Sequence, residues 1–289
     1  MTTDNTADKS LRQSSSNGNI HATQVRTHGR PVTVFEDTTI TNDSSESQRQ
    51  QQQSTEPSCY TSLNDLTNEE HFPKAGDRHM VNPPQDQNDL VLVCCQTTVG
   101  PWSILVHPSW APHGARRFLD MVTSNYFNVK VPLMRCVQDF LCQFGLAGSI
   151  SANYASKIPD DPAWLPTGKD HRYNVETGVK RFQKGYLAYA GSGPKSRGRQ
   201  LFVALEESKS LGGSLNAPWE VPWGELVGRH SYDTLDKIYT GYGENGPDQN
   251  KLTQQGAHEY VHDQFPKLDW ILSCHIVDQE SSSPMVATT

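Results

Sequence analysis

The feature that most constrains the fold of this chain is a series of short apolar runs that begins at Asp89 and is punctuated by glycine and proline. The first two runs, "DLVLVCCQTT" at 89–98 and "WSILVH" at 102–107, flank the turn-like "VGP". Runs of this kind are typical of β-strands joined by tight turns. A chain with many strands and few helices must protect its strand edges, which favours a barrel or a sandwich. We therefore expect a mainly β domain capped by helices.

The remaining elements follow from the same patterns. Further strands are predicted at 131–137, 140–145, 185–191, 199–206, 220–228 and 268–277. Apolar residues at helical spacing predict a helix over 112–122, and two more helices are predicted over 231–241 and 252–265. Ser231 is the expected N-cap of the second helix, and Pro266 ends the third.

The first 86 residues have a different composition from the rest. They are rich in Ser, Thr, Asn, Gln and Asp, include "SESQRQQQQS", and show no sustained hydrophobic period. Such a segment cannot bury enough apolar surface to offset its ordering entropy. We expect a disordered tail at 1–86, one domain at 87–279 and a disordered C-terminal tail at 280–289. The first tail is either a spacer or a segment that binds a partner or is phosphorylated.

Charge and hydropathy exclude several functional classes. The formal net charge of -7 gives no sign of a nucleic-acid-binding surface. No apolar run approaches the roughly 18 to 20 residues of a membrane helix, and the opening "MTTDNTADKSLRQ" lacks the apolar core of a secretory signal. We expect a cytoplasmic monomer that binds neither nucleic acid nor membrane.

The six cysteines show no CxxC spacing. Cys94 and Cys95 are adjacent on a predicted strand, so their side chains should point to opposite faces. We expect buried free thiols in a reducing compartment, with a disulfide framework as the alternative.

Two polar side chains interrupt the apolar stretch "VPLMRCVQDFLCQFG" at 131–145. Arg135 lies within the first run and Gln143 within the second, where a fully buried strand would carry apolar residues. Leu141 and Gln143 are two residues apart and therefore share one face of a strand. A plain buried strand does not explain these two polar side chains.

The ordered set of motifs resembles the cyclophilin-type peptidyl-prolyl cis-trans isomerase family. The motifs are "TTVG", "VHPSWAPHGARRFLDMV", "RCVQDFLCQFG", "GYLAYAGSGPKSRGRQLFV" and "WGELVGRHSYDTLDKIY", spread over about 89–277. The resemblance implies a closed eight-stranded antiparallel barrel capped by helices, with the active groove on its outer surface. It also implies proline-containing peptides or proteins as substrates, and no metal or cofactor.

The resemblance assigns a role to each groove residue. Arg135 matches the catalytic arginine, and Gln143 matches the glutamine that binds substrate backbone beside it. The other matched positions are the apolar proline pocket and the contacts with residues before the proline: Phe140, Leu141 and Phe202 for the pocket, and Ala190, Gly191 and Gln200 for the contacts.

The chain also departs from the family pattern. Leu133 and Met134 replace Phe-His, and Gln138-Asp139 replace Pro-Gly. Gly191 stands in place of an asparagine, and Glu220 in place of the histidine near the proline pocket. A carboxylate at Glu220 could pair with Arg135 or repel an acidic substrate.

Two alternatives to an isomerase remain at this point. One is a cyclophilin-fold module that binds proline peptides with little catalysis, in view of Gly191 and Glu220. The other is a zinc hydrolase, because His258-Glu259-Tyr260-Val261-His262 fits the HExxH pattern, with Glu280 as a conceivable third ligand. The glycine-rich "GSGPKSRG" lacks the lysine-hydroxyl ending of a phosphate loop and precedes a strand, so we reject a nucleotide site there.

Overall fold

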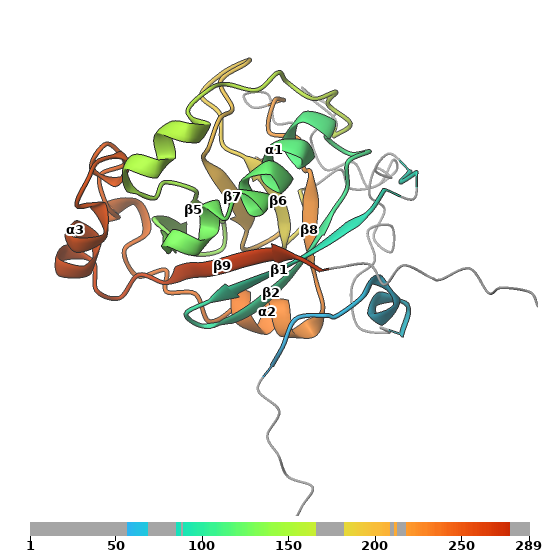
Figure 1. Cartoon of the computed structure of the whole chain (residues 1–289), viewed down its shortest axis with the longest axis horizontal. Coiled ribbons are helices and arrows are strands. Elements are labelled where there is room, and N and C mark those ends of the chain that lie inside the picture. Colours follow the sequence, from blue (N-terminus) through green and yellow to red (C-terminus); the bar gives the residue numbers. More distant parts are fainter. Residues whose placement is uncertain are drawn as a thin grey trace, which may run out of the picture. The chain divides into compact units, whose positions relative to one another are not determined.

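In the computed structural model, the part of the chain that is described forms one nine-stranded sheet in which the neighbouring strands are antiparallel (Figure 1). The described residues are 57–68, 85–87, 89–165, 182–208, 211–212 and 218–277. The predicted tail therefore lies mostly outside the described residues, as does the predicted C-terminal tail.

The strands follow the predicted runs. They are β1 Val91–Thr97, β2 Gly100–Val106, β3 Val131–Pro132, β4 Arg135–Val137, β5 Leu141–Phe144, β6 Tyr186–Tyr189, β7 Leu201–Ala204, β8 Gly224–Val227 and β9 Trp270–Ile276. Each predicted strand overlaps an observed one, so the mainly β class is confirmed. Their order in the sheet is β3-β9-β1-β2-β8-β6-β7-β5-β4.

The sheet curls so that its first and last strands come from one short segment. β3 pairs with β9, and β4 pairs with β5. Only Leu133 and Met134 separate β3 from β4, and their backbone N–H groups donate to opposite partners, Asp269 of the β9 side and Gln143 of β5. The two ends of the sheet are therefore brought together at 131–137.

Three α-helices cover the described domain. They are α1 Pro112–Thr123, α2 Arg229–Leu235 and α3 Ala257–Gln264, and short 3-10 helices lie at η2 Leu63–Asn68, η3 Tyr126–Val129, η4 Gly148–Tyr154, η6 Gly243–Asn245 and η7 Lys251–Thr253. Figure 1 shows α1 and α2 on opposite sides of β1, β2 and β9. No helix among the described residues combines the length and apolar character needed to cross a membrane.

The predicted helix boundaries were correct for α1 and wrong for the other two helices. α2 begins after Gly228, which has a positive φ of 86°, and not at Ser231. The Ser231 hydroxyl instead donates to the Val227 carbonyl at 2.6 Å and accepts the Ser103 N–H at 2.8 Å. The predicted helix 252–265 is interrupted, because Gly256 adopts a left-handed conformation before α3.

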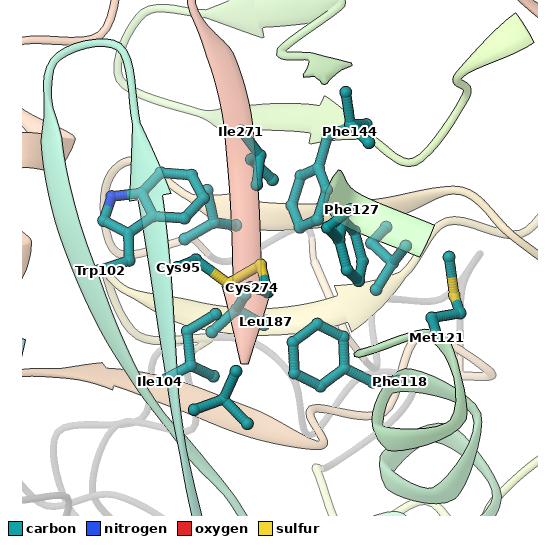
Figure 2. Close-up of a cluster of buried hydrophobic side chains, with 14 of the residues drawn as sticks. Cys95, Trp102, Ile104, Phe118, Met121, Phe127, Phe144, Leu187, Ile271 and Cys274 are labelled. Atoms are coloured by element: carbon teal, nitrogen blue, oxygen red, sulfur yellow. A yellow bond between two sulfur atoms is a disulfide. The ribbon is translucent and has the colours of Figure 1, made fainter. Parts of the chain in front are cut away.

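The main core lies inside the curled sheet, against α1. Figure 2 shows Phe118 and Met121 of α1 directed toward the side chains of the sheet, including Leu187 of β6 and Ile271 of β9. All four side chains are at most 1% exposed. Burial of apolar side chains on this scale is the main favourable contribution to folding.

All six cysteines are paired, so the expectation of free thiols was wrong. The disulfides are Cys59–Cys94, Cys95–Cys274 and Cys136–Cys142. The opposite orientations of Cys94 and Cys95 are confirmed, since Cys94 pairs with Cys59 of the 57–68 segment and Cys95 pairs with Cys274 of β9 within the core, as Figure 2 shows for the second disulfide. The cytoplasmic location, which was inferred partly from free thiols, stays a prediction.

Part of the predicted tail contacts the domain. Tyr60 donates its backbone N–H to the Ser103 hydroxyl at 3.0 Å, and its ring lies edge-on to His230 with centroids 4.8 Å apart. Together with the Cys59–Cys94 disulfide, these contacts attach residues 57–68 to β1, β2 and α2. The boundary at residue 87 therefore stays a prediction, with an attached segment on its N-terminal side.

A buried histidine joins another tail residue to the sheet. His107 is 4% exposed and stacks on Trp110. Its Nδ1 lies 2.9 Å from Asp86, and its Nε2 lies 3.2 Å from Glu225. Burial alone would lower the pKa of His107, but the two carboxylates outweigh it and raise the pKa above its usual value of 6.5. The charged form of His107 therefore stabilises the fold.

We predict that Asp86→Asn destabilises the protein more at pH 5.5 than at pH 9. A raised folded-state pKa contributes stability below pH 6.5, and that stability is lost as the pH rises through the folded-state pKa. Loss of one hydrogen bond to a charged group should cost about 1 to 3 kcal/mol at the lower pH. Urea unfolding at both pH values measures this, with the exposed Asp89→Asn as control. An equal loss at both pH values contradicts the prediction.

Candidate active groove

The strand register places the predicted catalytic residue Arg135 in one row with two predicted substrate-binding residues. Arg135 of β4 is opposite Gln143 of β5, Gln143 is opposite Phe202 of β7, and Phe202 is opposite Ala188 of β6. Directly opposed residues share a face of the sheet and have neighbouring Cβ atoms. Three predicted positions, Arg135, Gln143 and Phe202, thus come together although Phe202 lies far from the other two in the sequence.

The Arg135 guanidinium is held by two side chains. Its Nη1 donates to Gln143 Oε1 at 3.2 Å, while Nε and Nη2 donate to the two carboxylate oxygens of Glu244 at 2.7 and 2.5 Å. These bonds lower the pKa of Glu244. The suggestion that Glu220 pairs with Arg135 was wrong, because η6 brings Glu244 to the guanidinium instead.

The same face of the sheet carries a second apolar cluster. Along β5, β6 and β7 alternate side chains point into the main core and into this outer cluster. Leu141 and Phe202, both predicted for the proline pocket, belong to the outer cluster and are 4% and 0% exposed. Phe182 covers Phe202 with ring centroids 5.5 Å apart, whereas Phe140 is partly buried at the margin.

A polar cavity of about 520 Å³ adjoins the row. Five residues predicted for the groove line it: Gln143, Ala190, Gly191, Gln200 and Glu220. The other lining residues were not anticipated: Ala155, Lys157, Ser192, Ser196, Gly198, Arg199 and Gln249. Arg135, Phe140, Leu141 and Phe202 do not line this cavity. The predicted site is therefore divided between an open polar part and a covered apolar part.

Neighbouring side chains engage both backbone polar groups of Gly191. The Trp219 indole Nε1 donates to the Gly191 carbonyl at 3.0 Å. The Gly191 N–H donates to Glu220 Oε1 at 3.4 Å, a long hydrogen bond. A side chain at position 191 would collide with Trp219, since a Cβ built there lies 2.7 Å from its Cδ1. The glycine and the tryptophan therefore fit together.

Comparison with protein families identifies the domain. The model of the cyclophilin type peptidyl-prolyl cis-trans isomerase/CLD family matches residues 92–256, more than half of the chain. The chain belongs to the cyclophilin-type peptidyl-prolyl cis-trans isomerase family. The family predicted from the ordered motifs is thus confirmed.

Curated members of the cyclophilin family are distant in sequence. Peptidyl-prolyl cis-trans isomerase-like 3 of Neurospora crassa is 27% identical over 151 residues, which cover 50% of this chain and 81% of that protein. Peptidyl-prolyl cis-trans isomerase CYP18-2 of Arabidopsis thaliana is 26% identical over 125 residues, covering 42% of this chain and 68% of that protein.

Solved cyclophilin structures also resemble this chain. A cyclophilin type peptidyl-prolyl cis-trans isomerase of Cryptosporidium parvum covers 66% of this chain, and 99% of its own length is matched, with a TM-score of 0.40 and 16% identity. The same protein has been solved in the presence of the dipeptide Ala-Pro, with a TM-score of 0.40 and 65% of this chain covered.

Glu220, where the cyclophilin pattern has a histidine, is an unusual carboxyl group. Burial raises its pKa to about 7, against an ordinary value of 4.5, although hydrogen bonds from the backbone of Gly191 and Gly212 act in the opposite direction. The folded state therefore favours the protonated form of Glu220. Ionisation at neutral pH costs free energy in this part of the groove.

We predict that Glu220→Gln stabilises the protein relative to the unmodified chain at pH 8 but not at pH 4.5. A carboxyl whose folded-state pKa is raised loses stability as the pH rises from about 4.5 to about 7, and glutamine does not ionise. At 1.36 kcal/mol per pKa unit the gain is at most about 3 kcal/mol. Urea unfolding at the two pH values measures it, with the exposed Glu259→Gln as control. A pH-independent difference contradicts the assignment.

The HExxH pattern lies on α3. His258 Nε2 lies 2.8 Å from the Lys130 carbonyl oxygen, and His262 Nδ1 lies 3.2 Å from Asp263. Within the described ranges, no three His, Cys, Asp or Glu side chains are grouped as a metal site would require. Glu280, the suggested third ligand, lies outside the described residues.

Sequence reasoning missed Glu244 as a groove residue. It named Trp219 only as a candidate for the tryptophan of the family pattern and assigned it no place in the groove. Glu244 is 109 positions from Arg135, and Trp219 is 28 positions from Gly191. Nothing local in the sequence signals either contact. The departures from the family pattern at Gly191 and Glu220 were the available signal that this part of the groove is altered.

Proposed function

We propose that this chain is a peptidyl-prolyl cis-trans isomerase in which Arg135 stabilises the twisted amide of an X-Pro bond. The observation that carries the proposal is the row formed by Arg135, Gln143 and Phe202, with a donor bonded to an amide beside an aromatic ring. The substrates would be proline-containing peptides or proteins. The proposal requires no metal or cofactor.

The chemistry follows from the amide itself. Rotation about an X-Pro bond has a barrier of roughly 18 to 20 kcal/mol, because the nitrogen shares its lone pair with the carbonyl. In the twisted state the lone pair returns to the nitrogen, which then accepts a hydrogen bond. A fixed donor therefore stabilises this state more than the planar one. Arginine suits the task because it stays protonated and presents a rigid set of N–H donors.

The contacts of Arg135 leave donors for this purpose. Of the five N–H groups of a guanidinium, three are engaged by Glu244 and Gln143 in the contacts described above. The other two, one on each terminal nitrogen, are the ones we assign to the substrate. Glu244 and Gln143 then fix the direction in which these donors point.

The remaining predicted residues would bind the peptide. We assign Phe140, Leu141 and Phe202 to the proline ring, which requires the cover over Phe202 to move. Gln143, Ala190, Gly191 and Gln200 would contact the backbone on either side, along the polar cavity. Glu220 would lie beside the chain that precedes the proline.

We predict that Arg135→Ala lowers kcat/KM by about 100-fold or more, since loss of one well-placed donor commonly has an effect of this size. The assay is protease-coupled cis-trans interconversion of an Ala-Ala-Pro-Phe anilide. Arg229→Ala, at an exposed arginine of α2, is the matched control and should leave the rate unchanged. An unchanged rate in Arg135→Ala removes the residue assignment.

A second candidate function is a proline-peptide-binding module with little catalysis. The specific observations in its favour are the burial of Phe202 and the two-point contact between Glu244 and Arg135. Calorimetric titration with the same peptide separates the two. Binding without acceleration above the uncatalysed rate supports the module, and acceleration that depends on Arg135 supports the isomerase.

We further propose that 131–137 acts as one bent strand. β3 and β4 would then count together, and the nine-stranded sheet would become a closed eight-stranded barrel. The backbone bonds of Leu133 and Met134 to opposite neighbours support this interpretation. Such closure would leave no free sheet edge at the groove, which would hold Arg135 rigidly.

A further inference from the structure

At Gly191, two side chains of the chain itself bond to the backbone of the groove. Gly191 lies two residues beyond the end of β6. A peptide bound in extended form is held largely by hydrogen bonds to backbone N–H and C=O groups. At Gly191 both groups are already engaged, the carbonyl by the Trp219 indole at 3.0 Å and the N–H by Glu220 at 3.4 Å. Two consecutive residues of this chain thus take the places that a peptide backbone would use.

A Cβ at position 191 would meet both Trp219 and Ser196. The Cβ of any other residue at 191 would lie 2.7 Å from Trp219 Cδ1 and 2.9 Å from its Nε1, below the distance that real contacts reach. The asparagine of the family pattern would therefore exclude Trp219 from this position. The indole of Trp219 therefore occupies space that becomes available only when residue 191 is glycine.

We propose that Trp219 and Glu220 compete with the substrate backbone at Gly191, so that Trp219 determines how long a peptide the groove accepts without rearrangement. This inference rests on the proposed function, which assigns Gly191 to the residues before the proline. A peptide too short to reach Gly191 leaves the indole in place. A longer peptide must displace it and loses the free energy of that hydrogen bond.

The geometry of the cavity supports a length-dependent effect. Gly191, Ala190 and Glu220 line the 520 Å³ cavity, whereas Arg135 and Phe202 do not. The proline end and the N-terminal end of a bound peptide would therefore lie in different parts of the groove. Each additional extended residue before the proline adds about 3.3 Å, so a longer peptide reaches further toward Gly191.

Trp219→Phe tests the inference because it keeps an aromatic ring and removes the N–H donor. We measure binding of Ala-Pro, Ala-Ala-Pro and Ala-Ala-Ala-Pro peptides by calorimetry, and isomerisation of the matching anilides. For the longest peptide we expect Kd and KM to fall about 2- to 10-fold, the range of a typical net hydrogen bond. For Ala-Pro we expect no change. Trp270→Phe on β9 is the matched control and should behave as the unmodified chain.

A second measurement needs no variant. The indole N–H resonance of Trp219 should shift when the unmodified chain binds the longest peptide and should stay in place with Ala-Pro. This readout reports displacement of the indole even if the phenylalanine variant does not fold. An unmoved resonance in a saturated complex overturns the inference.

The outcomes separate this inference from the proposed function. Tighter binding of long peptides by Trp219→Phe, with no isomerisation by either protein, supports the competition and contradicts the isomerase. Isomerisation that depends on Arg135, with the same Kd and KM at every peptide length in both proteins, overturns the competition and leaves the isomerase standing. No binding of any peptide by either protein overturns both.

Discussion

The register of β4, β5, β7 and β6 is the constraint on which the rest of this structure depends. It places Arg135, Gln143 and Phe202 in a row on one face of the sheet, and it sends the alternate residues into the main core. A shift of one residue in any pairing would exchange the two faces. The polar residues that interrupt the apolar runs are therefore explained by the pairing of the strands.

Residues of the chain itself already contact the main side chains and backbone groups of the groove on this face. Glu244 binds Arg135, Phe182 covers Phe202, and Trp219 with Glu220 engages Gly191. Each contact is made by a residue from a different connecting segment. The domain thus combines the framework of the cyclophilin family with connections that occupy the surface where, in our proposal, a peptide binds.

The contacts in the outer apolar cluster contribute to the free energy of folding. Phe182 and Phe202 bury aromatic surface against each other, which stabilises the fold. Access of a proline ring to Phe202 would expose part of that surface and substitute its own. Glu220 has the opposite effect and lowers stability near neutral pH, because its burial disfavours ionisation. If a peptide binds here as we propose, its binding would be linked to the stability of this face of the sheet.

Much of the fold could be predicted from the sequence. The alternation of apolar residues determines which segments become strands, and every predicted strand overlaps an observed one. Helix α1 was predicted because its apolar period is regular and Pro112 begins it. The helix around Ser231 was misplaced because its hydroxyl bonds to Ser103 on a distant strand, and such a partner has no local signature.

The sequence by itself determined the mainly β fold, the family, and the residue types available at the groove, because these depend on local period and on ordered motifs. Only the tertiary structure decided the partners: Glu244 for Arg135, Trp219 for Gly191, and paired cysteines in place of free thiols. The physical reason is distance along the chain. Hydrogen bonds, ion pairs and disulfides form between atoms a few ångströms apart, and the curled sheet brings together residues that the sequence separates by as many as 179 positions.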